Sequence, residues 1–325
     1  MRTFLQIIKT MRRINTLFVV LALAVMTIAF LPSCSDTKDD EWGGDNNEAK
    51  NVNQNDATQE KALARLEFPN IKTLYGKPYA TRTALRIYSL PDQYGINYSV
   101  LWDCDKKAQR WSAYQLKKTM KYSQGIRGDF EEDPDLYPSY RVSDSFSYYK
   151  GSGFERGHIC PSADRQYSVE ANQQTFYFTN IHPQYHMFNS GASNRESPWL
   201  RLENKVRTWA KGNDTEVLYV VKGGTIEDDQ LLKAQPKIKG QLPVPGYFFV
   251  ALLMKNNQTQ PYKAIGFLIP HDNVDHGDDP LSKYAMNIRE LEGKTGFDFF
   301  CNLPDDVEEH VETLALENVL RAWKP

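Results

Sequence analysis

The sequence predicts one α+β domain that follows an N-terminal export segment. Short apolar and aromatic runs predict strands at 98–102, 111–116, 176–179, 217–221, 247–254 and 264–269. Apolar residues at helical spacing predict helices at 199–211, at 281–291 and over the last twenty residues. Strands and helices alternate irregularly, without a fixed-period repeat. We therefore expect a mixed or antiparallel sheet core with packed helices rather than a βαβ array.

Composition supports a globular domain and limits how it could bind a polyanion. Hydrophobic residues make up 41% of the 325 residues, which is enough to build a core, and 25% are charged. The formal net charge of −2 excludes a protein that coats nucleic acid through bulk positive charge. Any binding to nucleic acid must use a local basic patch.

The N-terminus is typical of an export signal. Residues 1–13 contain four basic side chains and no acid, and residues 17–31 are almost all apolar. This apolar run is too short to span a bilayer comfortably, so residues 1–33 are predicted to be a signal peptide. Cys34 directly follows and resembles the lipidated cysteine of a bacterial lipobox. A plain signal peptide cleaved nearby, or an uncleaved anchor, remains the alternative.

A lipid on Cys34 would attach the protein to the bacterial cell envelope, at either face of the outer membrane; without a retained lipid it would be secreted. Residues 34–65 are mostly polar and poor in large apolar side chains, which favours a flexible acidic tether. The folded domain is then expected to span 66–325. Membrane contact is expected only through the lipid, and the oligomeric state is left open.

Three cysteines remain after Cys34, so at most one disulfide can form within the chain. We expect a Cys104–Cys160 bond, which an exported protein permits. The alternative is three small buried thiols, with Cys301 as the third. No C-x-x-C pair is present to suggest a zinc site.

The segment Arg156-Gly157-His158 contains residue types suited to hydrolysis of a phosphodiester. A histidine can take a proton from water near neutral pH, and an arginine presents a fork of donors to phosphate oxygens. Taken alone, such a tripeptide is more often a surface turn than an active site.

A second segment strengthens the case for a catalytic site. Asn189 offers a neutral oxygen that a hard cation accepts alongside water. In the predicted helix from Trp199, Glu203 lies at the edge of the apolar stripe. Glu203 therefore either pairs with Arg207 at i,i+4 or points into a site where it holds metal-bound water.

These motifs together resemble those of the DNA/RNA non-specific endonucleases of the ββα-metal class. The resemblance is carried by ERGHICPSADR, TNIHPQ, FN and WLRLE, and extends through WSAYQL, RGDFEEDPDL and YAMNIRELEGKTGFDFFCNLPDD. It spans roughly residues 75–310. It implies an active site on a finger of two strands and a helix.

The resemblance also implies a role for each site residue. His158 would be the general base, and Asn189 would be the direct protein ligand of a Mg²⁺ ion. Glu203 would hold a metal-bound water, Arg156 would neutralise charge in the transition state, and Arg127 would contact a more distant phosphate. Mn²⁺ could replace Mg²⁺. The substrates would be DNA and RNA, bound through backbone phosphates with little sequence preference.

Two departures from the family pattern leave alternatives open. Glu155 stands where the family has an aspartate, and the spacing from Asn189 to Trp199 is longer than usual. The longer spacing leaves Asn194 as a second candidate for the metal ligand. A weakened site would make the protein a surface lipoprotein that binds nucleic acid without cutting it.

The remaining polar residues are expected to have structural rather than catalytic roles. His182 and His186 have the spacing of a helical zinc pair, but Pro183 between them argues against one. Residues 271–279 are expected to form a polar surface loop, and Asn180 is expected to stabilise the finger by hydrogen bonds. The basic residues Lys117, Lys118 and Lys121 could contact nucleic acid or simply maintain solubility.

Overall fold

The computed structural model describes residues 51–90, 95–120, 128–142, 145–257 and 261–325. These residues belong to one compact unit, 47–325. The predicted signal peptide, Cys34 and residues 34–50 lie outside the described residues, as do Arg127 and Lys121. Within the described ranges, no helix is both long and apolar enough to cross a bilayer.

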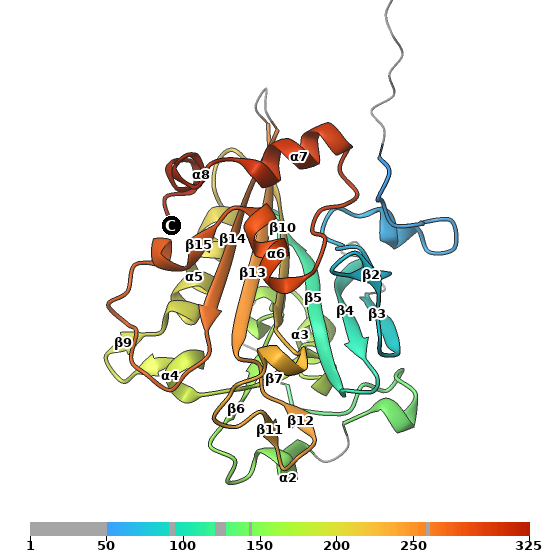
Figure 1. Cartoon of the computed structure of the whole chain (residues 1–325), viewed down its shortest axis with the longest axis vertical. Helices are drawn as coiled ribbons and strands as arrows, with labels where there is room; N and C mark the ends of the chain where they lie inside the picture. The colour runs from blue at the N-terminus through green and yellow to red at the C-terminus, as the bar shows by residue number, and fades with distance from the viewer. Residues whose placement is uncertain (1–50, 91–94, 121–127, 143–144, 258–260) are drawn as a thin grey trace, which may run out of the picture. The chain divides into compact units, whose positions relative to one another are not determined.

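The centre of the unit is a seven-stranded sheet in the order β15-β14-β13-β10-β5-β4-β3, with every neighbouring pair antiparallel (Figure 1). Its strands are β3 (Thr83–Ser89), β4 (Ile96–Asp103), β5 (Ala108–Leu116), β10 (Thr215–Gly224), β13 (Tyr247–Asn256), β14 (Tyr262–Pro270) and β15 (Ala285–Met286). The predicted α+β class with an antiparallel sheet core is confirmed, and five of the six predicted strands coincide with members of this sheet.

The sheet is buried on both faces, which explains why its central strands read as continuous apolar runs. In β13, Phe248 and Phe249 are both fully buried but belong to different core clusters. Adjacent residues of a strand point to opposite faces, so each residue contributes to one layer. Trp102 and Trp111 are likewise buried in opposite layers.

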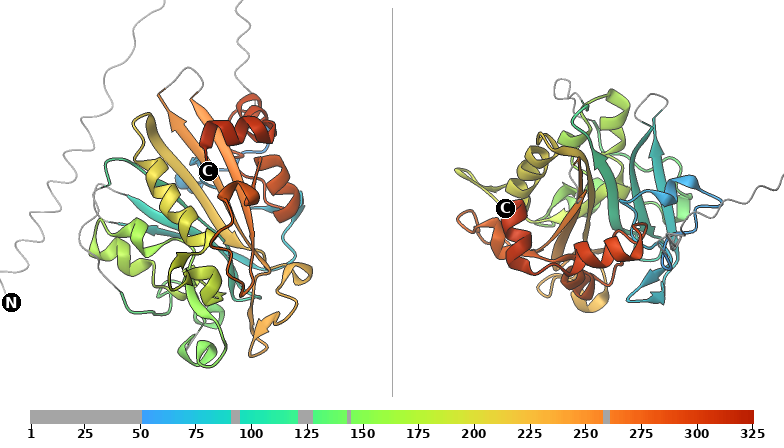
Figure 2. Two further views of the ribbon diagram at one scale, coloured as in Figure 1. Left: turned by 90° about the vertical axis from the view of Figure 1, so that its left-hand side faces the viewer. Right: turned by 90° about the horizontal axis from the view of Figure 1, so that it is seen from above.

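Helices cover the two faces of the sheet, as the side view in Figure 2 shows. One face carries α5 (Pro198–Ala210), whose Trp199, Leu202 and Val206 enter the core. The Ser197 hydroxyl caps α5 by accepting from the Leu200 amide at 3.1 Å, and Pro198 occupies its first turn. The opposite face carries α6 (Ile288–Thr295) and α7 (Asp305–Thr313).

Shorter elements complete the unit. The helices are η1 (Lys61–Ala64), η2 (Pro138–Tyr140), α2 (Ser145–Tyr149), η3 (Ser162–Arg165), α3 (Val169–Gln174), η4 (Phe178–Asn180), α4 (His186–Asn189), η5 (Asp228–Gln230), η6 (Leu281–Tyr284) and α8 (Leu316–Trp323). The strands form four two-stranded sheets: β1 (Thr73–Leu74) with β2 (Lys77–Pro78), β6 (Glu155–His158) with β7 (Ile181–Gln184), β8 (Gly191–Ala192) with β9 (Arg195–Glu196), and β11 (Lys237–Ile238) with β12 (Leu242–Pro243).

Three predicted elements need correction. The strand expected at 176–179 is replaced largely by η4, and the strand β7 begins only at Ile181. The helix expected at 281–291 is divided into η6, β15 and α6, because Asn287 is extended and starts a new helix by accepting from the Glu290 amide. The C-terminal helix is two helices, since Leu314 and Ala315 have extended backbone angles.

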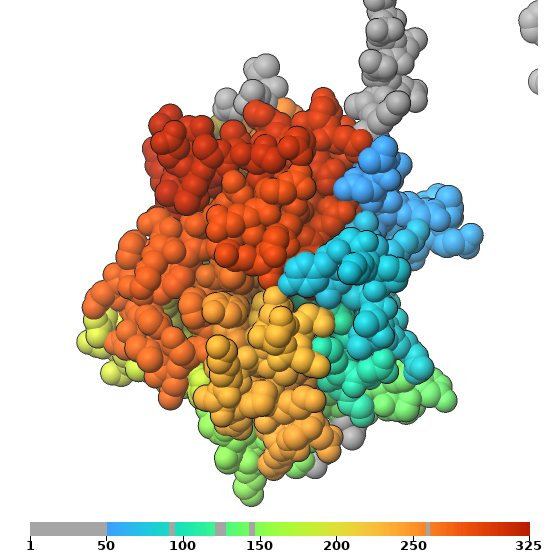
Figure 3. Space-filling model, viewed as in Figure 1, coloured from blue at the N-terminus to red at the C-terminus, as the bar shows by residue number. Residues whose placement is uncertain are grey.

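Residues 51–65 pack on the domain, although the sequence placed them in the tether. Asn55 is buried and donates to the Pro69 carbonyl at 3.0 Å, while Asn53 donates to Asp298 and Glu308. Figure 3 shows these N-terminal residues (blue) beside the C-terminal part of the chain (red). The folded domain therefore begins before residue 66. Asparagine hydrogen bonds and the buried side chains of Ala62 and Leu63 together supply the contacts.

The expected Cys104–Cys160 disulfide is not formed. Cys104, Cys160 and Cys301 are all free and buried, as the alternative interpretation proposed. Burial raises the pKa of the Cys104 and Cys160 thiols to about 11, so neither is a reactive thiolate at neutral pH.

Candidate active site

The site is built on the antiparallel hairpin of β6 and β7, in which His158 lies opposite Ile181 and Gly157 opposite His182. Glycine suits position 157 because a Cβ there would lie 2.0 Å from the side-chain oxygen of the buried Gln184 and would displace that side chain. Alternation along β6 directs Arg156 and His158 to one face of the hairpin and Glu155 to the other.

Asn180 fixes the backbone just after His158. Its amide oxygen accepts from the Cys160 N–H at 2.9 Å, and its amide nitrogen donates to the Cys160 and Thr175 carbonyls at 2.9 and 2.8 Å. The Asn180 carbonyl also accepts from the Ile159 N–H at 3.0 Å. The prediction that Asn180 stabilises the finger by hydrogen bonds is therefore confirmed.

Aromatic side chains support the face that carries His158 and Arg156. The His158 ring lies edge-on to Phe176, with centroids 4.7 Å apart, and 5.4 Å from the ring of Phe130. The Arg156 guanidinium carbon lies 4.0 Å from the Phe130 ring centroid. Such a cation–π contact holds the charge in place, so Phe130 keeps the arginine and the histidine on one surface.

Glu155 joins β6 to α4 through two contacts of its carboxylate. One oxygen lies 2.8 Å from His186 Nδ1, and the other accepts from Asn189 Nδ2 at 2.8 Å. Because the Asn189 nitrogen faces Glu155, its amide oxygen is turned away from the carboxylate. A cation ligand requires this orientation of the amide. Asn194, in contrast, is exposed in the turn between β8 and β9.

Glu203 on α5 is mostly buried and is ion-paired with a residue that the sequence did not single out. Its Oε1 lies 2.6 Å from Nζ of Lys222 on β10. The i,i+4 pair with Arg207 does not form, because Arg207 instead donates to Asp164 at 2.8 Å. The signal in the sequence was a lysine within the apolar run VLYVVKGG, where a charge needs a buried partner.

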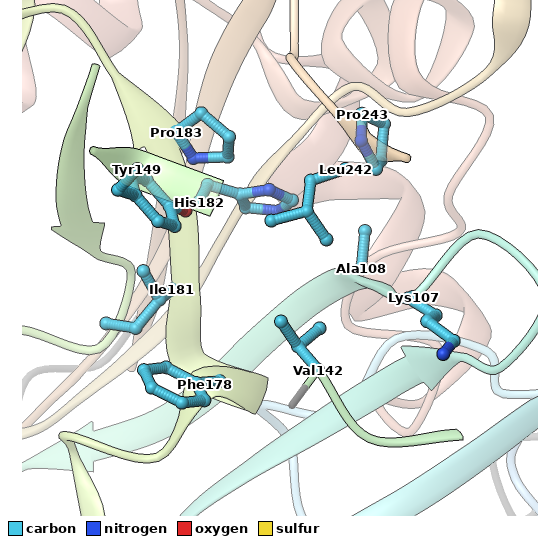
Figure 4. Close-up of a pocket in the computed structure, with 10 residues that line it drawn as sticks. All are labelled: Lys107, Ala108, Val142, Tyr149, Phe178, Ile181, His182, Pro183, Leu242 and Pro243. Atoms are coloured by element: carbon cyan, nitrogen blue, oxygen red, sulfur yellow. The ribbon is translucent and has the colours of Figure 1, made fainter. Parts of the chain in front are cut away.

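A narrow, mainly apolar cavity lies along β7, as Figure 4 shows. Tyr149, Phe178 and Ile181 form one side of it, and Leu242 and Ala108 the other. Burial raises the pKa of Tyr149 strongly, and the charge of Arg156 partly opposes that shift. Tyr149 therefore stays a neutral phenol, and its ring lines the cavity.

The other histidines do not form a zinc pair. His182 is buried, its Nε2 lies 3.0 Å from the Gln109 carbonyl, and burial lowers its pKa to about 4. His186 is engaged with Glu155. Across the described ranges, no three His, Cys, Asp or Glu side chains are arranged to hold a metal ion. A cation here would need amide and water ligands.

Residues 272–279 form an irregular surface segment between β14 and η6, as expected, but His271 is buried and its Nε2 accepts from the Tyr185 N–H at 2.9 Å. Arg195 on β9 reaches this segment and pairs with Asp275 at 2.6 Å and with Asp278. The inserted residues between Asn189 and α5 therefore form a small hairpin that is bound to a neighbouring loop. Lys117 and Lys118 are exposed beyond the end of β5.

Comparisons with known proteins identify the family of this chain. The profile of the family described as DNA/RNA non-specific endonuclease matches residues 89–306. The mitochondrial nuclease EXOG of Xenopus laevis is 29% identical over 241 residues, which are 71% of this chain and 62% of that protein. A nuclease of Nostoc sp. is 29% identical over 255 residues, covering 75% of this chain and 85% of the relative.

Human mitochondrial endonuclease G is 26% identical over 215 residues, covering 64% of this chain and 68% of that protein. A crystal structure of the EndoG/EndoGI complex shares the fold, with a TM-score of 0.53 at 21% identity, over 70% of this chain and 89% of the other. The residues matched by the family profile include the hairpin that carries His158. The chain belongs to the DNA/RNA non-specific endonuclease family, whose members are hydrolases acting on phosphodiester bonds.

Proposed function

We propose that this protein is a metal-dependent endonuclease that hydrolyses DNA and RNA with little sequence preference. The observation that carries the proposal is the joint placement of His158 and Arg156 on one face of β6 and of Asn189 against Glu155. The family and its named nucleases support the same activity.

The residues fit a divalent cation bound mainly by water. Asn189 would hold Mg²⁺, or Mn²⁺, through the amide oxygen that Glu155 turns outward, and Glu203 would hold a water of the cation. When bound, such an ion stabilises the charge on the leaving oxygen. Glu155 is one methylene longer than the family's aspartate, and it still reaches Asn189 and His186 together.

The protein side chains would divide the remaining chemistry. His158 takes a proton from the attacking water as its oxygen bonds to phosphorus, and the bond to the leaving oxygen breaks. Arg156 donates to the phosphate oxygens, where negative charge accumulates. Arg127 would contact a neighbouring phosphate. Contacts to phosphate rather than to bases would make cleavage insensitive to sequence.

The proposed location is the bacterial cell envelope. Cys34 would carry the lipid, and residues 35–50 would separate the domain from the membrane. The polar composition of that segment supports this proposal. Labelling with a radioactive or clickable fatty acid, compared between the native chain and Cys34→Ala, tests it.

The activity is tested with the full chain on plasmid DNA and on RNA, in the presence of Mg²⁺ and of EDTA. Wild type is expected to degrade both polymers, and EDTA or His158→Ala should reduce the rate by at least ~10². His310→Ala is the matched control, because His310 is exposed on α7. Binding without cleavage under any divalent metal would instead favour a nucleic-acid-binding lipoprotein.

A further inference from the structure

We propose that Lys222 is a positioning residue of the metal site. It holds the carboxylate of Glu203 in one orientation, so that a single oxygen remains to accept from water around the cation. This inference rests on the proposed function of Glu203. It adds a residue on the central sheet to a site otherwise made by the finger and α5.

The contacts of Lys222 are well defined. Its side chain is 3% exposed, and Nζ lies 2.6 Å from Glu203 Oε1 and 4.2 Å from the ring centroid of Trp199. Trp199 and Glu203 are one turn apart on α5, so both contact the same ammonium group. A charge-assisted hydrogen bond and a cation–π contact together restrict both partners to one geometry.

The surroundings make this pair hard to break. The cavity between α5 and the sheet is lined by Leu202, Val206 and Val250, which cannot accept from an ammonium group. Asp164 also lines it, but its two oxygens already accept from Tyr114 and Arg207 at 3.0 and 2.8 Å. Among the described residues, Glu203 is the acid that is ion-paired with Lys222.

Separating two buried charges is costly, because each would remain without a partner in an apolar environment. Glu203 therefore keeps Oε1 on Lys222 and has Oε2 available for the cation's water. The same turn of α5 is packed against α4, since the ring centroids of Trp199 and Phe188 are 5.3 Å apart. Phe188 is the neighbour of Asn189 in the sequence. Lys222 thus sets the position of one water-holding group relative to the ligand.

The test compares Lys222→Met with Lys222→Arg in the full chain. Binding of Mn²⁺ is measured by electron paramagnetic resonance without nucleic acid, and cleavage is measured over a range of Mg²⁺ and DNA concentrations. For Lys222→Met we expect Mn²⁺ binding weaker by about 10-fold, as for loss of other outer-shell partners. We also expect a lower kcat with little change in KM for DNA, and partial recovery in Lys222→Arg.

Lys255→Met is the matched control, because Lys255 pairs with Glu216 at 3.0 Å on an exposed part of the sheet. It should leave Mn²⁺ binding unchanged. Lys222→Met could unfold the domain by leaving Glu203 unpaired, so the double variant Lys222→Met/Glu203→Gln is measured as well. We expect it to regain thermal stability relative to Lys222→Met while Mn²⁺ binding stays weak.

Wild-type Mn²⁺ affinity and kcat in Lys222→Met would overturn the positioning role, even if the melting temperature fell. That outcome leaves the proposed nuclease intact. If wild type itself neither binds Mn²⁺ nor cleaves DNA, the proposed function fails and this inference fails with it. The two failures are therefore distinguishable.

Discussion

At the scale of single residues, the site depends on side chains that restrict other side chains. Glu155 touches both His186 and Asn189, and Phe130 touches both Arg156 and His158. None of these supporting contacts lies within one turn or one strand. Each contact restricts a side chain before a ligand binds. The entropy cost of ordering that side chain is therefore not added to the free energy of ligand binding.

Glu155→Gln is expected to weaken binding of the cation at the proposed metal site. A glutamine has one acceptor oxygen, so it cannot accept from both Asn189 Nδ2 and a protonated His186 Nδ1 as the carboxylate can. The outward orientation of the Asn189 amide should become less populated, and Mn²⁺ affinity should fall about 10-fold. A titration followed by electron paramagnetic resonance measures this, with the exposed Glu170→Gln as control. Unchanged affinity would show that Glu155 does not orient the ligand.

At the scale of elements, the hairpin of β6 and β7 is placed by close backbone approach, and α5 by its cap and apolar stripe. Gly157 pairs with His182 across the hairpin and lies against the Gln184 side chain, which occupies the space of a Cβ. The long-range pairing of residues 155–158 with 181–184 brings the histidine beside the segment that leads into α4.

Gly157→Ala is expected to destabilise the domain and to reduce activity together. The added Cβ would meet the side-chain oxygen of the buried Gln184 at 2.0 Å, so that side chain or the strands must shift, at a cost of about 1–3 kcal/mol. Thermal denaturation and cleavage assays measure both effects. Gly293→Ala in α6 is the matched control, because its Cβ would meet nothing within 4 Å and alanine favours helix by up to about 1 kcal/mol. Equal stability of the two variants would contradict the role given to Gly157.

At the scale of the whole domain, residues far apart in the chain meet around a group of buried carboxylates. Asn53 near the N-terminus donates to Asp298 and Glu308, and Arg289 pairs with Glu292 and Glu312. One arginine cannot neutralise four acids, and burial raises the pKa of Asp298, Glu292, Glu308 and Glu312.

This group predicts that stability falls as pH rises. Burial raises the pKa of Glu308 to about 7 from its usual 4.5, so the native state binds protons that the unfolded state releases. The stabilisation is complete below about pH 4.5 and is lost as pH rises through about 7. The rise in the pKa of Glu308 alone corresponds to about 3 kcal/mol over that window.

The melting temperature, measured from pH 5 to pH 8, is expected to decrease for wild type. Glu308→Gln should show a smaller decrease, because a neutral amide replaces the titrating carboxyl group. Glu317→Gln is the control, since Glu317 is exposed on α8, outside this group. A melting temperature that rises over this range would contradict the prediction.

The sequence by itself determined the α+β class, five of the six predicted strands, the helix from Trp199 and the family resemblance. These features follow from local periodicity and from short motifs, both of which are properties of the sequence and do not depend on distant contacts. It did not determine the ends of the domain or the state of the cysteines. Asn53 and Cys160 owe their environments to residues distant in the chain.

Only the tertiary structure decided which residues support the site. Glu203 has Arg207 four residues away, yet it pairs with Lys222, because α5 rests on β10 with that lysine beneath it. Glu155 reaches Asn189 because the hairpin folds back against α4. Helix phase and strand alternation predict the direction in which a side chain points. The residue that it contacts depends on which element packs against it.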